Sequence, residues 1–320
     1  MSNPVMDTSP GRARSDDTGS RRPLLWVLLA VVLWSGMAAL IGAALQEVSA
    51  LRLLVWSYLP AAAVVALYHR VVRHEPVREL FAVPPRLLAM GLPGILLWPV
   101  GLVTGLALAP LVQANLISYL WPLLLVLLAP LAGERFRAVY LLAALVGFGG
   151  AALLVLSHSA AAGSTPYAAW GYLAAFGAAA GWAAYGIFLS RHRPLRGRVP
   201  ALIMWSALVL LVVAAVTGDL APPSGTTVWA CLALGAGPLS IAFLAWDRAT
   251  AQTSIARLGI LSYLDPLLST LLLAWVLSRP LTASDWTGLA LVIAAAAIAE
   301  AGPRAAASRP TTAATEEGTG

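Results

Sequence analysis

LSYLDPLLSTLL, at residues 261–272, repeats a segment that the chain has already used at residues 117–128, where it reads ISYLWPLLLVLL. Shared leucines mean little in so apolar a chain. Both copies, however, place Ser-Tyr-Leu and then a proline in the middle of an apolar run, at Pro122 and Pro266. Each run is long enough to cross a bilayer. The sequence therefore predicts a membrane protein built from two related halves.

Composition supports a membrane location. The chain has 320 residues, of which 60% are hydrophobic and only 11% are charged. Soluble domains carry about 25% charged residues, so most apolar side chains here must face lipid. The net charge of +6 is spread over short loops, which argues against nucleic acid as a partner. Cys231 is the single cysteine, so neither an internal disulfide nor a thiolate metal cluster is expected.

Apolar runs set the number of helices. A helix rises about 1.5 Å per residue, so a bilayer core of about 30 Å needs about 20 apolar residues. We expect an all-α membrane protein of about ten transmembrane helices, at residues 24–44, 53–69, 87–108, 112–132, 138–157, 167–190, 200–217, 227–246, 255–277 and 284–301.

Arginine placement predicts the orientation. With the N-terminus inside, every arginine except Arg52 and Arg279 falls on the cytoplasmic side, as the positive-inside rule requires. Both termini are then cytoplasmic, and the location is a bacterial inner membrane. Because each half has an odd number of spans, the second half is predicted to be inverted relative to the first. The expected divisions are a disordered tail at 1–22, five-helix repeats at 23–158 and 159–302, and a disordered tail at 303–320.

Asp265 is the most unusual residue within the predicted spans. A lone carboxyl deep in a membrane helix is costly, so it should face a cavity or a partner. One interpretation is a proton-coupling site or a counter-ion for a substrate ammonium. The other is a protonated carboxyl that hydrogen-bonds a neighbouring helix.

Other polar and aromatic side chains near mid-span are candidates for lining a substrate cavity. Tryptophan and tyrosine at such depth need a partner for their N–H or O–H, although packing alone explains many of them. Pro122 and Pro266 are candidate hinges, or static bends. With Asp265, the cavity set is Trp34, Trp98, Asn115, Ser118, Tyr119, Trp121, Trp182, Tyr185, Ser262 and Tyr263.

Four stretches together resemble a known family. They read VVLWSGMAALI (31–41), ANLISYLWPLLLVLLAPLAGER (114–135), AAFGAAAGWAAYGIFLSR (174–191) and LAWDRATAQTSIARLGILSYLDPLLSTLLLAWVLSRPLTASDWTGLALV (244–292). The chain is similar to the EamA-type, ten-helix branch of the drug/metabolite transporter superfamily, most of all to its aromatic amino-acid exporters. The resemblance implies two EamA-like repeats around a central cavity. Those exporters have an uncharged residue at the position of Asp265.

The expected function is a secondary transporter that exports aromatic or other neutral amino acids, or related metabolites, by alternating access. The alternative is a multidrug or organic-cation exporter of the same superfamily. A membrane enzyme or scaffold is disfavoured, because the spans hold no catalytic constellation. The four histidines, His69, His74, His158 and His192, are expected in loops at or beyond the ends of the predicted spans, so we expect no metal site, and no cofactor. The expected partners are a small-molecule substrate, the lipid bilayer and, for coupling, protons. A Gly177-Gly181 pair is expected to pack within a monomer, with a homodimer left open.

Overall fold

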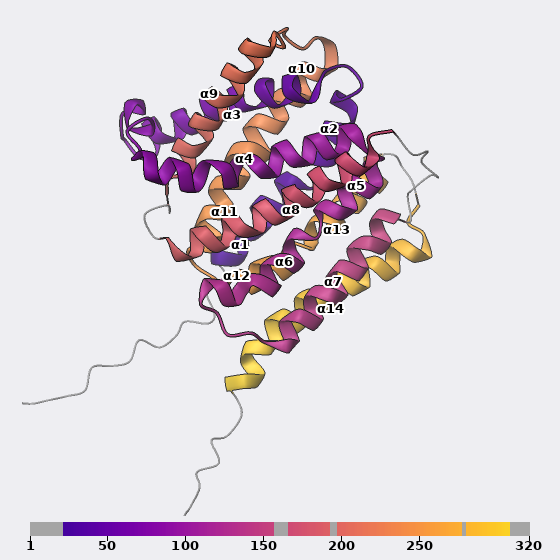
Figure 1. Cartoon of the computed structure of the whole chain (residues 1–320). Helices are drawn as coiled ribbons and strands as arrows, with labels where there is room; N and C mark the ends of the chain where they lie inside the picture. Colours follow the sequence, from indigo (N-terminus) through magenta and orange to yellow (C-terminus); the bar gives the residue numbers. More distant parts are fainter. Residues whose placement is uncertain (1–21, 157–165, 193–196, 277–279, 308–320) are drawn as a thin grey trace, which may run out of the picture.

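The computed structural model describes residues 22–156, 166–192, 197–276 and 280–307. All regular structure in these ranges is helical (Figure 1). The α-helices are α1 (Arg22–Trp34), α2 (Met37–Ala44), α3 (Ala50–Val71), α4 (Pro85–Leu108), α5 (Leu111–Ser118), α6 (Trp121–Leu128), α7 (Ala138–Leu156), α8 (Ala168–Arg191), α9 (Val199–Thr217), α10 (Gly225–Ala236), α11 (Ala242–Thr250), α12 (Ile255–Leu261), α13 (Leu264–Val276) and α14 (Ala283–Ala307). Two 3₁₀ turns, η1 (Val77–Leu80) and η2 (Ala129–Ala132), and a π-helical turn, η4 (Gly237–Ile241), complete them.

The helices account for the predicted spans. Within the described ranges, 9 helical segments are long and apolar enough to cross a membrane, and the shorter Ala283–Ala299 is a further candidate. This confirms an all-helical membrane protein of about nine or ten spans. Helix α14 runs to Ala307, past the predicted tail boundary at 303. Arg279, the boundary near 158, and the predicted tails up to residue 21 and from residue 308 lie outside the described residues.

Several spans are broken near their middle. The fourth span divides into α5 and α6 at Tyr119 and Leu120, just before Pro122. The ninth divides into α12 and α13 at Ser262 and Tyr263, just before Pro266. Proline lacks the backbone N–H that would continue the helix and its ring crowds the preceding turn, so the repeated motif gives the same break twice. The first span also breaks, between α1 and α2, and η4 interrupts the eighth.

Helices of the first half pack against their counterparts in the second half. Helix α3 packs on α9, α6 packs on α12, and α7 packs on α14. Helices α7 and α14 can be followed side by side in Figure 1. The contact of α4 with α8 is matched by that of α11 with α1. Glycines permit the closest approaches: a Cβ on Gly150 of α7 would lie 2.8 Å from the carbonyl oxygen of Gly288 of α14. Each of these contacts is therefore formed either by two equivalent helices or as one of two equivalent pairs, as expected for two related halves.

Polar contacts join the halves at the ends of the spans. Beyond α9, Asp219 accepts hydrogen bonds from the Ser49 hydroxyl and, at 2.6 Å, from the Arg52 guanidinium. These two groups hold the pKa of Asp219 below its usual range. Elsewhere, the Glu134 carboxylate accepts the backbone N–H of Ile255 at 2.6 Å and so caps the start of α12.

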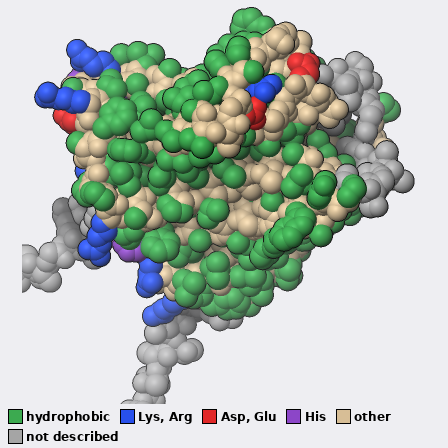
Figure 2. Space-filling view, turned by 45° about the horizontal axis from the view of Figure 1, so that its top comes forward, with side chains coloured by type: hydrophobic (Ala, Val, Ile, Leu, Met, Phe, Trp, Pro, Cys, Tyr) green, Lys and Arg blue, Asp and Glu red, His purple; other side chains and the backbone are tan. Residues whose placement is uncertain are grey.

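Hydrophobic side chains cover most of the outer surface. In Figure 2, charged side chains lie along the left side and near the top of the view, with a broad, largely apolar face below and between them. Many of these side chains are large and exposed, among them Trp275 and Val216, at 78% and 83%. A surface with so many large exposed apolar side chains is suited to contact with lipid.

Candidate functional site

Large aromatic side chains from both halves form one buried cluster. The ring of Trp34, on α1, lies 5.5 Å from that of Trp98 and 5.7 Å from that of Trp182. Trp98 and Trp182 are 5.1 Å apart, and Trp121 lies 6.2 Å from Trp34. All four are almost fully buried. The structure therefore brings together four of the residues predicted to line a cavity.

Two further members were missed by the sequence analysis. Trp246 lies 5.6 Å from Trp34, and Phe243 stacks on Trp182 at 5.2 Å. A signal for Trp246 was present: it follows Trp98 by 148 residues, the same spacing that separates Trp34 from Trp182. The aromatic cluster, as we call Trp34, Trp98, Trp121, Trp182, Phe243 and Trp246, is therefore partly built from repeat-related pairs.

The aromatic cluster borders a small internal space, which we call the central space. Its volume is about 20 Å³, enough for about one water molecule. Most of the lining comes from the first half of the chain, and Asp265 is the one described lining residue from the second half. The lining is Trp34, Met37, Ala38, Trp98, Leu102, Asn115, Ser118, Tyr119, Trp121 and Asp265.

Asp265 carries the polar chemistry of the central space. Its side chain is only 8% exposed, and its Oδ1 atom is buried without a hydrogen-bond partner among the described residues. The carboxyl group interacts with the hydroxyl of Tyr119, which in turn interacts with the Asn115 side chain. An unsatisfied buried acceptor costs about 1–3 kcal/mol. A donor from a proton, a water or a ligand ammonium would remove this cost.

A second space adjoins the first. Its volume is about 150 Å³, and it shares Ala38, Asn115 and Tyr119 with the central space. Its other walls come from the end of α7 and from α13, where Pro266 and Thr270 lie. The Thr270 hydroxyl donates to the Pro266 carbonyl at 2.9 Å. Tyr119 and Asn115 therefore stand between two neighbouring spaces.

Other predicted cavity residues lie away from the central space. Tyr263 is fully buried, and its ring lies 2.5 Å from a Cβ built on Gly147 of α7. The Ser262 hydroxyl donates to the Leu258 carbonyl of its own helix at 2.8 Å. Tyr185 packs beside the aromatic cluster, 5.5 Å from Trp182. None of these is among the described residues that line the central space.

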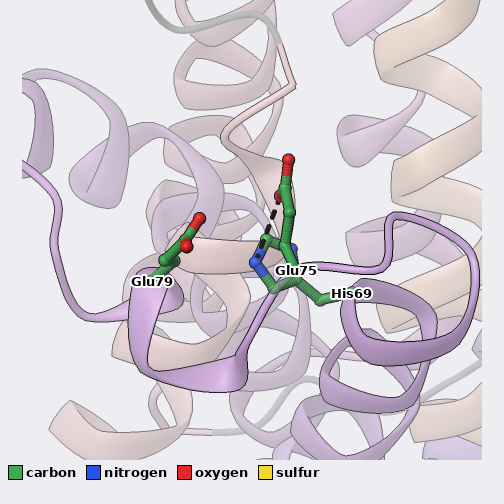
Figure 3. Close-up of side chains that lie close together, drawn as sticks. All are labelled: His69, Glu75 and Glu79. Atoms are coloured by element: carbon green, nitrogen blue, oxygen red, sulfur yellow. Dashed lines mark ion pairs between the residues drawn. The ribbon is translucent and has the colours of Figure 1, made fainter.

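The prediction that the histidines lie in loops is wrong for His69, and His158 lies outside the described residues. His69 lies within α3 rather than in a loop, because α3 continues to Val71. Its ring is buried, and its Nε2 atom lies 3.3 Å from Glu75, with Glu79 nearby (Figure 3). Arg73 contacts both oxygens of Glu75, at 3.0 and 3.2 Å. Because that guanidinium already neutralises Glu75, we interpret the group as an ion-pair network.

Comparison with known proteins gives consistent relatives. The chain matches the EamA-like transporter family over residues 21–156 and 169–300. It is 36% identical to the aromatic amino acid exporter YddG of Ancylobacter novellus over 202 residues, which are 61% of this chain and 69% of the relative. It is 25% identical to YddG of Salmonella typhimurium over 57% of this chain and 64% of that protein. A solved crystal structure matches with a TM-score of 0.75 at 30% identity, covering 88% of this chain and 98% of the other.

Proposed function

Because this chain belongs to the EamA-like transporter family, we propose that it exports aromatic or other neutral amino acids, or related small metabolites, by alternating access. It is a multi-pass membrane protein and not an enzyme. The homology to two aromatic amino acid exporters supports this substrate class.

The observation that carries the proposal is the unpartnered oxygen of Asp265 beside an aromatic cluster. An amino acid offers an ammonium group that suits this carboxylate, and the hydrogen bond to a charged group stabilises by about 1.5–3 kcal/mol. Tyr119 and Asn115 add polar groups on the same side of the space. Flat rings of Trp34, Trp98 and Trp121 offer surfaces for an aromatic side chain.

The small volume of the central space supports a transport cycle that includes a conformational change. Sites for drug-sized ligands measure roughly 300–1,000 Å³, whereas the central space measures about 20 Å³. Substrate therefore requires the surrounding helices to separate. The breaks before Pro122 and Pro266 are suitable hinges, since each stands where two helical segments meet without a continuous backbone ladder.

Two halves of opposite orientation around a central site suit alternating access. The proposed arrangement is two inverted five-helix repeats with both termini cytoplasmic in a bacterial inner membrane, working as a monomer. The arginine distribution supports the orientation. The contact of α4 with α8 has an equivalent in the contact of α11 with α1, and this correspondence supports the repeat.

One observation favours a second candidate, export of organic cations. A carboxylate beside several aromatic faces suits a lipophilic cation, because the ring faces attract positive charge. The two candidates differ in the ligand carboxylate, which amino acids have and simple organic cations lack.

Counterflow in liposomes tests the proposal. Purified full-length protein would be reconstituted with unlabelled solute inside and labelled solute outside, using phenylalanine, tryptophan, leucine and tetraphenylphosphonium. The proposal predicts exchange of the amino acids above protein-free liposomes, with and without a pH gradient. Exchange of tetraphenylphosphonium alone would support the second candidate. No amino-acid exchange under either condition would refute the first.

A further inference from the structure

A groove lies on the outer surface between α1, α3 and α11, and it shares no lining residue with the central space. Its volume is about 430 Å³. Nearly every lining side chain is apolar, and several are exposed, such as Leu67 at 64% and Val72 at 60%. These exposed walls are continuous with the lipid-facing surface. The groove is therefore open to hydrocarbon along its length.

Arg248 is the one charged residue among those lining the groove. Its guanidinium lies 5.1 Å from the ring of Trp26 and 5.4 Å from that of Tyr68. It donates to the Leu244 carbonyl at 3.1 Å and to the Tyr68 hydroxyl. Aromatic and hydrogen-bond contacts therefore fix the position of this positive charge.

Arg248 has no carboxylate partner among the described residues. The ion pairs among the described residues are formed by Arg52, His69 and Arg73, and none of them includes Arg248. A guanidinium has five N–H donors, and the contacts with Leu244 and Tyr68 engage only part of them. The remaining donors and the full charge are left for an anion from outside these residues.

The depth of Arg248 matches a lipid headgroup. It lies two residues before the end of α11 at Thr250, which is about 3 Å along the helix axis. Trp26 and Tyr68 are of the residue types that concentrate at the membrane interface. By the predicted orientation, this end faces the cytoplasmic leaflet, whose anionic lipids attract basic side chains.

We propose that this groove binds an anionic phospholipid, with the phosphate on Arg248 and one acyl chain along the apolar wall formed by α1, α3 and α11. The positive charge of Arg248 favours an anionic headgroup. The apolar wall favours a lipid, which has an acyl chain to cover it, over a free anion. The site does not depend on which solute the protein transports.

Lipid retention on the purified full-length protein tests the site. Native mass spectrometry would follow exchange in detergent containing equal phosphatidylglycerol and phosphatidylcholine. We expect preferential retention of phosphatidylglycerol, and about a fivefold loss of it in Arg248→Gln, the effect of removing one arginine near the surface. Arg248→Lys should keep most of the retention. Arg70→Gln, which removes an exposed arginine of α3, should retain as much as wild type.

A second variant tests the groove without touching Arg248. Leu67→Trp enlarges an exposed side chain on the groove wall and should reduce phosphatidylglycerol retention, with unchanged thermal stability in lipid-free detergent. Equal retention of the two lipids by wild type, or equal phosphatidylglycerol retention by wild type and a folded Arg248→Gln, would overturn the proposal. So would higher retention after deletion of residues 1–20, because the N-terminal segment would then be the occupant.

Discussion

The two copies of the Ser-Tyr-Leu-x-Pro motif both interrupt a helical span but have different surroundings. Both break their span in front of the proline. Tyr119 lines the central space, whereas Tyr263 is buried against Gly147. The residue before each proline is Trp121 in one copy and Asp265 in the other, and both line the same space. The repeat thus specifies where the helix bends, while the differing residues specify the chemistry.

Removing the charge that distinguishes the copies should have the largest effect. Asp265→Asn deletes the carboxylate and should reduce counterflow about 10- to 100-fold, the loss of a hydrogen bond to a charged group. Asp219→Asn makes the same substitution outside the site and should retain wild-type counterflow. If Asp265 serves only proton coupling, the variant should lose pH-driven flux and keep counterflow. Wild-type activity in both assays would exclude either role.

Removing the tyrosine hydroxyl from each copy of the motif should give a smaller difference in counterflow than removing the Asp265 carboxylate. Tyr119→Phe deletes a group that contacts both Asp265 and Asn115, and should reduce counterflow about three- to tenfold, because a typical single hydrogen bond contributes about 0.5–1.5 kcal/mol. Tyr263→Phe changes the matching residue away from the central space and should leave counterflow close to wild type. The comparison fails if Tyr263→Phe is the more damaging of the two.

Thermal stability should show where the second tyrosine acts. A methyl group at Gly147 would meet the Tyr263 ring at 2.5 Å, whereas one at Gly149, on the same helix, has no atom within 4 Å. Overpacking costs about 1–3 kcal/mol, so Gly147→Ala should lower the melting temperature by about 2–10 °C. Gly149→Ala should not lower it. Equal melting temperatures would mean that Tyr263 has room to move.

The smallest effect should come from the contact that joins the halves beyond α9. Exposed ion pairs contribute about 0–1 kcal/mol, so Asp219→Asn should lower the melting temperature by at most about 2–4 °C at neutral pH. The lowered pKa of Asp219 means that the folded state favours the charged form. The difference between wild type and variant should therefore disappear as the pH falls through the folded-state pKa. A difference that persists at low pH would point to packing instead.

Much of the fold was predictable, because apolar run lengths and mid-span prolines act locally. The breaks before Pro122 and Pro266 follow from such signals. The orientation of Tyr263 toward α7 was not predictable, since it depends on how α13 rotates against a helix distant in sequence. Trp246 was not among the predicted cavity residues, and the one signal for it is its 148-residue spacing from Trp98, which equals that between Trp34 and Trp182.

The close contact of α7 with α14 has a consequence for biosynthesis. Helix α7 is made well before α14, yet a Cβ on Gly150 of α7 would lie only 2.8 Å from the carbonyl oxygen of Gly288 of α14. Until α14 inserts, the face of α7 around Gly150 lacks the helix that covers it. A chain stalled before residue 283 would therefore leave this face of α7 open to lipid.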